Sequence, residues 1–321
     1  MRYLRLLITS LMVLTALGCA AWALAAQGGR WSVRLDILTH FAPMLLALSL
    51  LPAIYGLVFE RGGARLLLAG ISAVAIGACG VLVAPEYLRP ASPPAPDGAP
   101  GQIKLIQFNA WERNSRQAET ISWLRAQDPD ILVVEEASII APALKRAFRG
   151  YHVSCGDCSV MILSKARPVA RDVPVPPAAA DDDPPPIAGA TFRDSRGEFS
   201  VFGTHYTWPI HGGWQQAQGR VISGLLNRFP KERLILTGDF NSTPWSFSRR
   251  REDAMFGLER RTRALFSWPA DRSFAGLGLP FALLPIDHVY AGPGWRTVRA
   301  ERGPRLGSDH YPVIVTLAPS P

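Results

Sequence analysis

Three apolar stretches near the N-terminus constrain this chain more than any other feature of its sequence. They occupy residues 4–26, 35–59 and 66–83. A helix needs roughly 20 mainly apolar residues to cross the hydrocarbon core of a bilayer. The first two stretches reach that length and the third lies near its lower limit. We therefore expect about three transmembrane helices within residues 1–84.

The first stretch has two interpretations. Arg2 and Arg5 precede its apolar core, and Ala23-Leu24-Ala25 resembles a cleavage site with small residues, so it is either a signal peptide or a retained helix. Three crossings from a cytoplasmic N-terminus leave the rest of the chain outside the cytoplasm. Two crossings after cleavage of a signal peptide do the same. Both interpretations predict an exported C-terminal part.

The composition changes after these stretches. Residues 85–102, PEYLRPASPPAPDGAPGQ, are rich in proline and lack apolar periodicity, which predicts an extended linker. The following residues, 103–321, are numerous enough to bury a substantial core as one domain. The whole chain has 34 Lys and Arg against 26 Asp and Glu, a net charge of +8. This modest excess is compatible with phosphate-bearing partners but does not identify one.

Cys155 and Cys158 are the cysteines of this C-terminal part. Two cysteines alone cannot complete a structural zinc site. A redox-active C-x-x-C pair is expected to begin a helix, whereas the residues that follow Cys158 have a strand pattern. We expect a disulfide that closes a turn, with two free thiols as the alternative.

Short apolar runs alternate with helical patterns beyond residue 102. Runs rich in Val, Ile, Leu and Phe predict strands at residues 103–109, 130–136, 159–165, 198–206, 232–241, 285–292 and 310–318. Helical patterns cover residues 115–127, 137–148 and 213–229. This mixture predicts an α/β domain in which helices cover layered sheets.

Polar side chains lie at the ends of these predicted strands. They are Asn109, Glu136, His205, Asp239, Asn241, Asp287, Asp309 and His310. Each alone has an ordinary explanation, such as a turn cap, a solvated carboxylate or a buried histidine. Asp239 and Asn241, however, are two positions apart, so they can point to one side of a strand. Gathering such groups is costly unless a cation or a phosphate lies between them, and the set therefore predicts a site for one or the other.

Six segments carry a resemblance to a known family. QFNAW, DILVVEE, GTHYTWP, LTGDFNSTPW, PIDHVYA and GSDHYPVIV occur in the order seen in the endonuclease/exonuclease/phosphatase superfamily. The resemblance covers residues 103–317 and implies a deoxyribonuclease-I-like fold, a four-layer sandwich of two packed mixed β-sheets flanked by helices. Three spans ahead of such a domain resemble a bacterial subgroup. This implies a multi-pass inner (plasma) membrane protein with its catalytic domain, residues 103–321, on the periplasmic, extracytoplasmic side.

The resemblance also implies a metal and a set of roles. Glu136 would bind a hard divalent cation, magnesium or alternatively manganese, and Asn109 and Asp309 would complete or orient that region. The catalytic residues would be Asp239, which positions or deprotonates the attacking water; Asn241 and His205, which contact phosphate oxygens; and His310, which faces the phosphate and is oriented by Asp287.

Two neighbouring residues are expected to lie outside the site. Glu135 stands where the family usually has glutamine, and strand alternation predicts that it points away from the site. His288 follows Asp287 directly and is expected to face the opposite side of its strand.

The resemblance implies a membrane-anchored, metal-dependent phosphodiesterase or phosphatase, but the fold does not choose its substrate. Trp245, Arg249 and Arg250 follow the catalytic strand and are candidate substrate contacts suited to nucleic acid. A tether near a bilayer suits a phospholipid-type substrate equally well. The ordinary alternative for the arginines is a solvated helix. A non-catalytic membrane-bound binding or scaffold protein is the alternative function, and the complete set of polar residues argues against it. No feature indicates an obligate protein partner.

Overall fold

The computed structural model describes residues 2–171, 185–270, 273–274, 277–278 and 281–321. The chain forms two compact units. One contains Met1–Arg89 and Thr243–Arg250, and the other contains Pro90–Ser242 and Arg251–Pro321. The third long helix continues to Leu88. The linker predicted from residue 85 is therefore shorter at its start, because Pro85 lies inside this helix.

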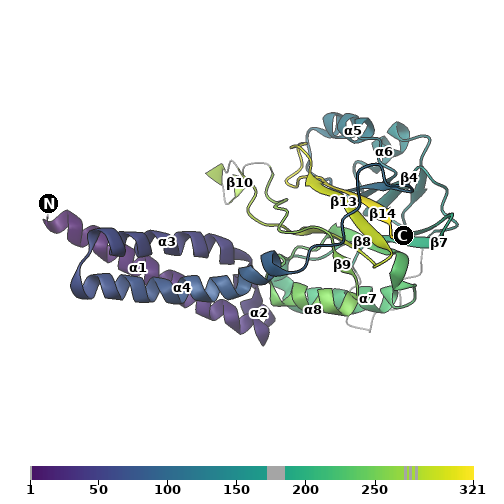
Figure 1. Ribbon diagram of the computed structural model, residues 1–321. Coiled ribbons are helices and arrows are strands. Elements are labelled where there is room, and N and C mark those ends of the chain that lie inside the picture. Colours follow the sequence, from purple (N-terminus) through teal and green to yellow (C-terminus); the bar gives the residue numbers. More distant parts are fainter. Residues whose placement is uncertain (1, 172–184, 271–272, 275–276, 279–280) are drawn as a thin grey trace. The chain divides into compact units, whose positions relative to one another are not determined.

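The first unit is built on three long helices, which Figure 1 shows side by side. They are α1 (Arg2–Gln27), α3 (Ala42–Phe59) and α4 (Gly62–Leu88), and the short α2 (Val33–Asp36) lies between the first two in the chain. Three segments are long and apolar enough to cross a membrane, namely Arg2–Arg30, Val33–Phe59 and Gly62–Leu88. Small residues such as Ala16, Ala23 and Ala75 are buried between the helices. Close packing through small residues is typical of helices that associate within a bilayer.

Thr243–Arg250 completes the first unit through polar contacts with the 3₁₀ turn and short helix that follow α1. The Asp36 carboxylate accepts hydrogen bonds from the backbone N–H groups of Phe247 and Ser248, each at 2.8 Å. These groups begin α8 (Phe247–Phe256). His40 Nδ1 lies 2.9 Å from Thr243 Oγ1, and Trp245 Nε1 donates to the His40 carbonyl oxygen at 3.2 Å. Asp36 thus satisfies backbone donors that a helix leaves unpaired at its N-terminus.

The second unit contains two six-stranded sheets. The first has the order β13-β14-β1-β2-β4-β3 and the second has the order β5-β6-β7-β8-β12-β9. In the first sheet the bounds are β1 (Ile103–Asn109), β2 (Ile131–Glu135), β3 (His152–Ser154), β4 (Val160–Ser164), β13 (Trp295–Arg302) and β14 (Val313–Pro319). In the second they are β5 (Ala170–Arg171), β6 (Ile187–Asp194), β7 (Gly197–His205), β8 (Leu234–Asp239), β9 (Glu259–Arg260) and β12 (Asp287–Ala291). The pairs β1–β2 and β7–β8 are parallel and the other neighbours are antiparallel, so both sheets are mixed.

Alternation along the strands creates four layers. Residues of one parity, including Val133 in β2 and Ile235 in β8, fill the core between the two sheets. The alternate residues of the first sheet, including Phe108, point to its outer face and pack with α5 (Gln117–Ala126) and α6 (Ala141–Ala147). The alternate residues of the second sheet, including Leu236, point to its outer face and pack with α7 (Gly212–Leu226). Figure 1 shows α5 and α6 on one side of the sheets and α7 on the other. The predicted four-layer fold is confirmed.

Several elements were not predicted from the sequence. They are β3, β5, β6, β9, β13, α8 and the small pair β10 (Ser273–Phe274) with β11 (Leu277–Gly278). Strand β13 reads WRTVRAER, and its polar residues hide the alternation that marks a half-buried strand. A bulge between Thr297 and Arg299 interrupts its register further. Cys155 and Cys158 form a disulfide in the turn between β3 and β4, as expected from the sequence.

Candidate active site

The predicted site residues meet at one edge of the two sheets. In the parallel pairs, Asn109 lies beside Glu135, and His205 lies beside Asp239. Asp287 pairs with Asp239 across the antiparallel neighbours β12 and β8. Because parallel strands run in one direction, their polar last residues share an edge. The strand ends identified in the sequence therefore converge in space.

Asp239 lies at the centre of this cluster. Its Oδ2 atom is 3.1 Å from Asn109 Nδ2 and 3.5 Å from the Nε2 atoms of both His205 and His310. Its Oδ1 atom accepts a hydrogen bond from the backbone N–H of Asn241 at 2.9 Å. Burial raises the pKa of Asp239 to about 6, although the nearby His310 opposes the shift. A carboxyl group with this pKa is suited to accept a proton near neutral pH.

His310 is held between two carboxylates. Its Nδ1 donates to Asp287 Oδ2 at 2.8 Å, which turns Nε2 toward Asp239. Burial alone would lower the pKa of His310, but the charges of Asp287 and Asp239 raise it well above its ordinary value. The imidazole is therefore held as a cation whose Nε2–H faces the site.

Asn109 joins Asp239 to Glu136. Its Nδ2 donates to Glu136 Oε1 at 3.0 Å as well as to Asp239, and its Oδ1 accepts from the backbone N–H of Trp111 at 2.9 Å. Glu136 adopts a left-handed backbone conformation with φ of 48°, which takes the chain out of strand geometry directly after β2. Its side chain is 26% exposed, so it lies at the open side of the cluster.

Asn241 has a different set of partners from the one expected. Its Nδ2 donates to the Tyr206 carbonyl oxygen at 2.9 Å and lies 3.4 Å from Asp239 Oδ2. The two amide hydrogens are thus directed at protein oxygens. In this arrangement Asn241 orients Asp239 rather than presenting a donor to a phosphate.

The prediction that Glu135 points away from the site is wrong. Glu135 is fully buried, and its Oε2 accepts a hydrogen bond at 2.9 Å from Gln107 Nε2, which also donates to Asp287 Oδ1 at 2.8 Å. Burial, followed by the charge of Asp287, raises the pKa of Glu135 well above its ordinary value. Alternation continues through Glu135 and aims it between the sheets, while the left-handed Glu136 turns toward the same edge. Two consecutive glutamates therefore both belong to this region.

His288 lies outside the cluster, as the sequence predicts. It is on the outer face of β12, where its ring lies 5.8 Å from that of Phe240. Its Nε2 donates to the Ser242 carbonyl oxygen at 2.9 Å. These contacts identify a core histidine.

A pocket of about 300 Å³ opens above the cluster. Its described lining is Trp111, Glu112, Arg113, Glu136, His205, Trp208, Asp239, Asn241, Trp268, Asp309 and His310. Four of these residues are acidic and one is an arginine. An anionic phosphate would meet net repulsion from this lining unless a cation were bound with it. Carboxylate and amide oxygens are the donors that hard divalent cations prefer, so the residues present fit such a cation.

Two groups of residues could hold that cation. Ligand atoms of Asp239, Asp287 and His310 lie within 4.8 Å of one another, but Asp287 and His310 are already hydrogen-bonded to each other. Glu136 and Asp309 instead line the pocket. Asp309 Oδ2 accepts a hydrogen bond from Trp268 Nε1 at 3.1 Å, which orients the carboxylate there.

Comparison with known proteins agrees with this geometry. Residues 106–310 match the endonuclease/exonuclease/phosphatase family. The chain belongs to this family. A comparison with curated proteins gives no match.

Solved structures share the fold of this family member. A mannosyl-6-phosphatase from Bacteroides thetaiotaomicron is 18% identical, with a TM-score of 0.54 over 67% of this chain and 99% of that one. TDP2 from D. rerio, in complex with a single-strand DNA product, is 15% identical, with a TM-score of 0.54 over 68% and 99% of the two chains. Sphingomyelinase C from Streptomyces griseocarneus is 18% identical, with a TM-score of 0.51 over 67% and 99%. At these identities the likeness establishes the shared fold.

Three predicted substrate contacts of this family member do not line the pocket. Trp245 and Arg249 are fully buried, and Arg250 donates to the Leu82 carbonyl oxygen within the first unit. The prediction is wrong for Trp245 and Arg249, because a side chain with no exposed surface cannot contact a substrate. The arginine run lies within helix α8 and not in an open loop. Trp111 and Arg113 also line the pocket and were missed, although Trp111 lies only two residues after the end of β1.

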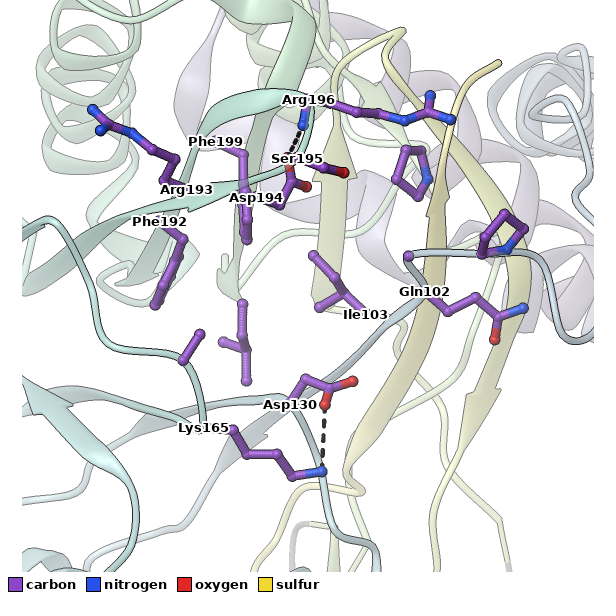
Figure 2. Close-up of a pocket in the computed structure, with 15 residues that line it drawn as sticks. Gln102, Ile103, Asp130, Lys165, Phe192, Arg193, Asp194, Ser195, Arg196 and Phe199 are labelled. Carbon is purple, nitrogen blue, oxygen red and sulfur yellow. Dashed lines mark hydrogen bonds and ion pairs between the residues drawn. The ribbon is translucent and has the colours of Figure 1, made fainter.

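A second cavity lies at the opposite edge of the sheets. It measures about 400 Å³ and includes Ile103 and Ile131, the first residues of β1 and β2. Figure 2 shows Asp130 paired with Lys165 on one side of it and Asp194 beside Arg196 on the other. Arg193 and Asp194 pair with Glu198 and Arg233, which lie outside its lining, so these charged side chains already have partners. The cavity contains none of the strand-end cluster.

Proposed function

We propose that this protein is a membrane-anchored, divalent-metal-dependent hydrolase of a phosphoester bond. The observation that carries the proposal is the placement of the buried Asp239 carboxylate between His205 and His310, beneath a pocket lined by carboxylates. The three apolar helices support the anchor. The family supports the reaction class.

Glu136, with Asn109 and Asp309, would hold the cation, which we propose is magnesium or manganese. Asn109 already orients the Glu136 carboxylate, and Asp309 is oriented by Trp268. When bound, the cation would neutralise charge on the phosphoryl oxygens.

The chain's own residues would perform the proton transfer and the charge stabilisation. Asp239, with its pKa of about 6, would take a proton from the attacking water as that water approaches phosphorus. The Asn241 N–H fixes the Asp239 carboxylate in orientation. His310 would donate from Nε2 to a phosphoryl oxygen, since Asp287 holds its other nitrogen. His205, with its side chain 21% exposed, would provide a second contact to the phosphate.

The proposal is tested with the full chain in detergent, magnesium and bis-p-nitrophenyl phosphate. We expect measurable hydrolysis, a fall of about 10³-fold or more in kcat for Asp239→Asn, and loss of activity in excess chelator that magnesium restores. His288→Gln, outside the cluster, is the matched control. Full activity in chelator, or in Asp239→Asn, would refute the proposal. Metal binding without turnover of any phosphoester would favour a non-catalytic binding protein.

A further inference from the structure

Three large apolar side chains are exposed between β7 and the first turn of α7. Trp208 is 56% exposed, Ile210 is 66% exposed and Trp214 is 56% exposed. We call these three residues the 208–214 surface. Apolar side chains of this size that are close together in the chain and in contact with water mark an interaction surface. Trp214 is also stacked on His211 at 4.9 Å between ring centroids, which holds it in place.

The 208–214 surface is continuous with the candidate active site. Trp208 lines the pocket that contains Glu136, Asp239 and His310. Its ring packs edge-on against Trp268, another pocket residue, at 6.2 Å between centroids. Whatever covers the 208–214 surface therefore lies at the mouth of the pocket.

We propose that the 208–214 surface docks on a lipid bilayer and that the substrate is a phosphoester in the head group of a lipid in that bilayer. This inference rests on the proposed function, because it names the substrate class of the same site. Trp side chains favour the interface between water and hydrocarbon, where an apolar ring and a polar N–H are both accommodated.

The chain itself supplies a reason for a bilayer as the partner. The second unit begins at Pro90, directly after an apolar helix that ends at Leu88. A short covalent link to a helix of membrane-spanning length gives the catalytic unit a high effective concentration at that membrane. A surface of three side chains is then sufficient, since it does not have to recruit the protein from solution.

The charge of the surface argues against nucleic acid. Affinity for nucleic acid comes largely from lysine and arginine contacts to phosphates. Residues 206–219, which include the whole 208–214 surface, contain neither lysine nor arginine. The described lining of the adjacent pocket has Arg113 against four acidic residues. The bilayer is therefore the occupant that the composition favours.

The test compares two substrates with the full chain reconstituted in vesicles of phosphatidylethanolamine and phosphatidylglycerol. One substrate is the vesicle phospholipid and the other is the water-soluble bis-p-nitrophenyl phosphate. The variant combines Ile210→Ser with Trp214→Ser, neither of which lines the pocket. We expect release of phospholipid products to fall at least about tenfold, while hydrolysis of the soluble ester changes by less than about twofold. Val169→Ser, which removes an aliphatic side chain that is 52% exposed elsewhere on this unit, should change neither rate.

A second measurement reports docking without catalysis. Lipids brominated near the head of the acyl chain should quench more tryptophan fluorescence in the wild type than in Trp214→Phe. Equal loss of both activities in the double variant would overturn the proposal, because the surface would then belong to the catalytic architecture. Hydrolysis of single-stranded DNA but not of phospholipid would also overturn it, as would concentration-dependent self-association that the double variant abolishes. If the wild type hydrolyses neither substrate, the proposed function fails. The quenching measurement still tests docking in that case. Stronger quenching in the wild type than in Trp214→Phe would support docking of the 208–214 surface, and equal quenching would overturn it.

Discussion

At the scale of single residues, the buried pair Glu135 and Gln107 is the most informative feature. Gln107 donates one hydrogen bond to Glu135 and one to Asp287, so a single amide connects two buried carboxyl groups. Among the described residues, Glu135 Oε1 and Gln107 Oε1 find no hydrogen-bond partner. A buried carboxyl group in this setting is more stable when it carries a proton.

Stability should therefore depend on pH through Glu135. The folded state raises the pKa of Glu135 above its ordinary value of 4.5. Below that value the group is protonated in both states, and above it the unfolded state ionises first, so stability is lost as the pH rises toward the folded-state pKa. We expect Glu135→Gln to raise the thermal midpoint of the full chain by at least about 2–4 °C at pH 8, and by less at pH 5. Glu135→Ala, which leaves a void, should lower it at both. An equal effect of Glu135→Gln at the two pH values would contradict the assignment.

At the scale of elements, α8 shows how a helix can depend on a side chain far away in the sequence. Its first half has no apolar periodicity and includes the run Arg249-Arg250-Arg251. Its backbone N–H groups at residues 247 and 248 are satisfied by Asp36, which is itself buried. The end of this helix that follows the catalytic strand is thus completed by the first unit, within which residues 243–250 pack.

Removing the Asp36 carboxylate should loosen the start of α8. Asp36→Ala leaves two buried N–H donors without an acceptor, and loss of such a cap costs about 0.5–2 kcal/mol. We expect faster amide hydrogen exchange at residues 247–250 in the full chain, with a smaller change in Asp36→Asn, which keeps one acceptor oxygen. Asp97→Ala, at a side chain that is 81% exposed, is the matched control. Unchanged exchange in Asp36→Ala would show that the cap does not hold the helix.

At the scale of the whole molecule, apolar helices of membrane-spanning length and a hydrolase fold occur in one chain. The helices are defined by length and composition, and their number is three in the described residues. The order of the segments leads us to propose that the catalytic unit lies on the extracytoplasmic side of a bacterial inner membrane. An exported hydrolase would act on substrates outside the cytoplasm.

Reporter fusions decide this orientation. Alkaline phosphatase, which is active only outside the cytoplasm, should be active when fused after Pro321. A fluorescent protein that matures only in the cytoplasm should stay dark at the same position, and the reverse result would refute the proposed side. Fusions after Phe59, between the second and third spans, should give the opposite pair of signals.

The place where the polar residues meet could be predicted from the sequence alone, and so could seven strands of the catalytic unit, namely β1, β2, β4, β7, β8, β12 and β14. Apolar alternation defines a strand and its faces, and a polar residue at the end of a buried strand has to lie at an edge of the sheet. For that reason Asn109, Glu136, Asp239, Asp287 and His310 could be assigned to one cluster in advance, and the family motifs agreed.

The residue that lies opposite each side chain could be learned only from the three-dimensional fold. The left-handed backbone of Glu136 cannot be read from alternation, and it is the reason that Glu135 and Glu136 share one region. The burial of Trp245 and Arg249 depends on a unit built partly from residues 1–89, so a local pattern of arginines and aromatics was misleading. The tertiary structure places Trp208 in the lining of the pocket. Local sequence determines which face of a strand or helix a side chain points to. The residue that packs against it there comes from a segment distant in the chain.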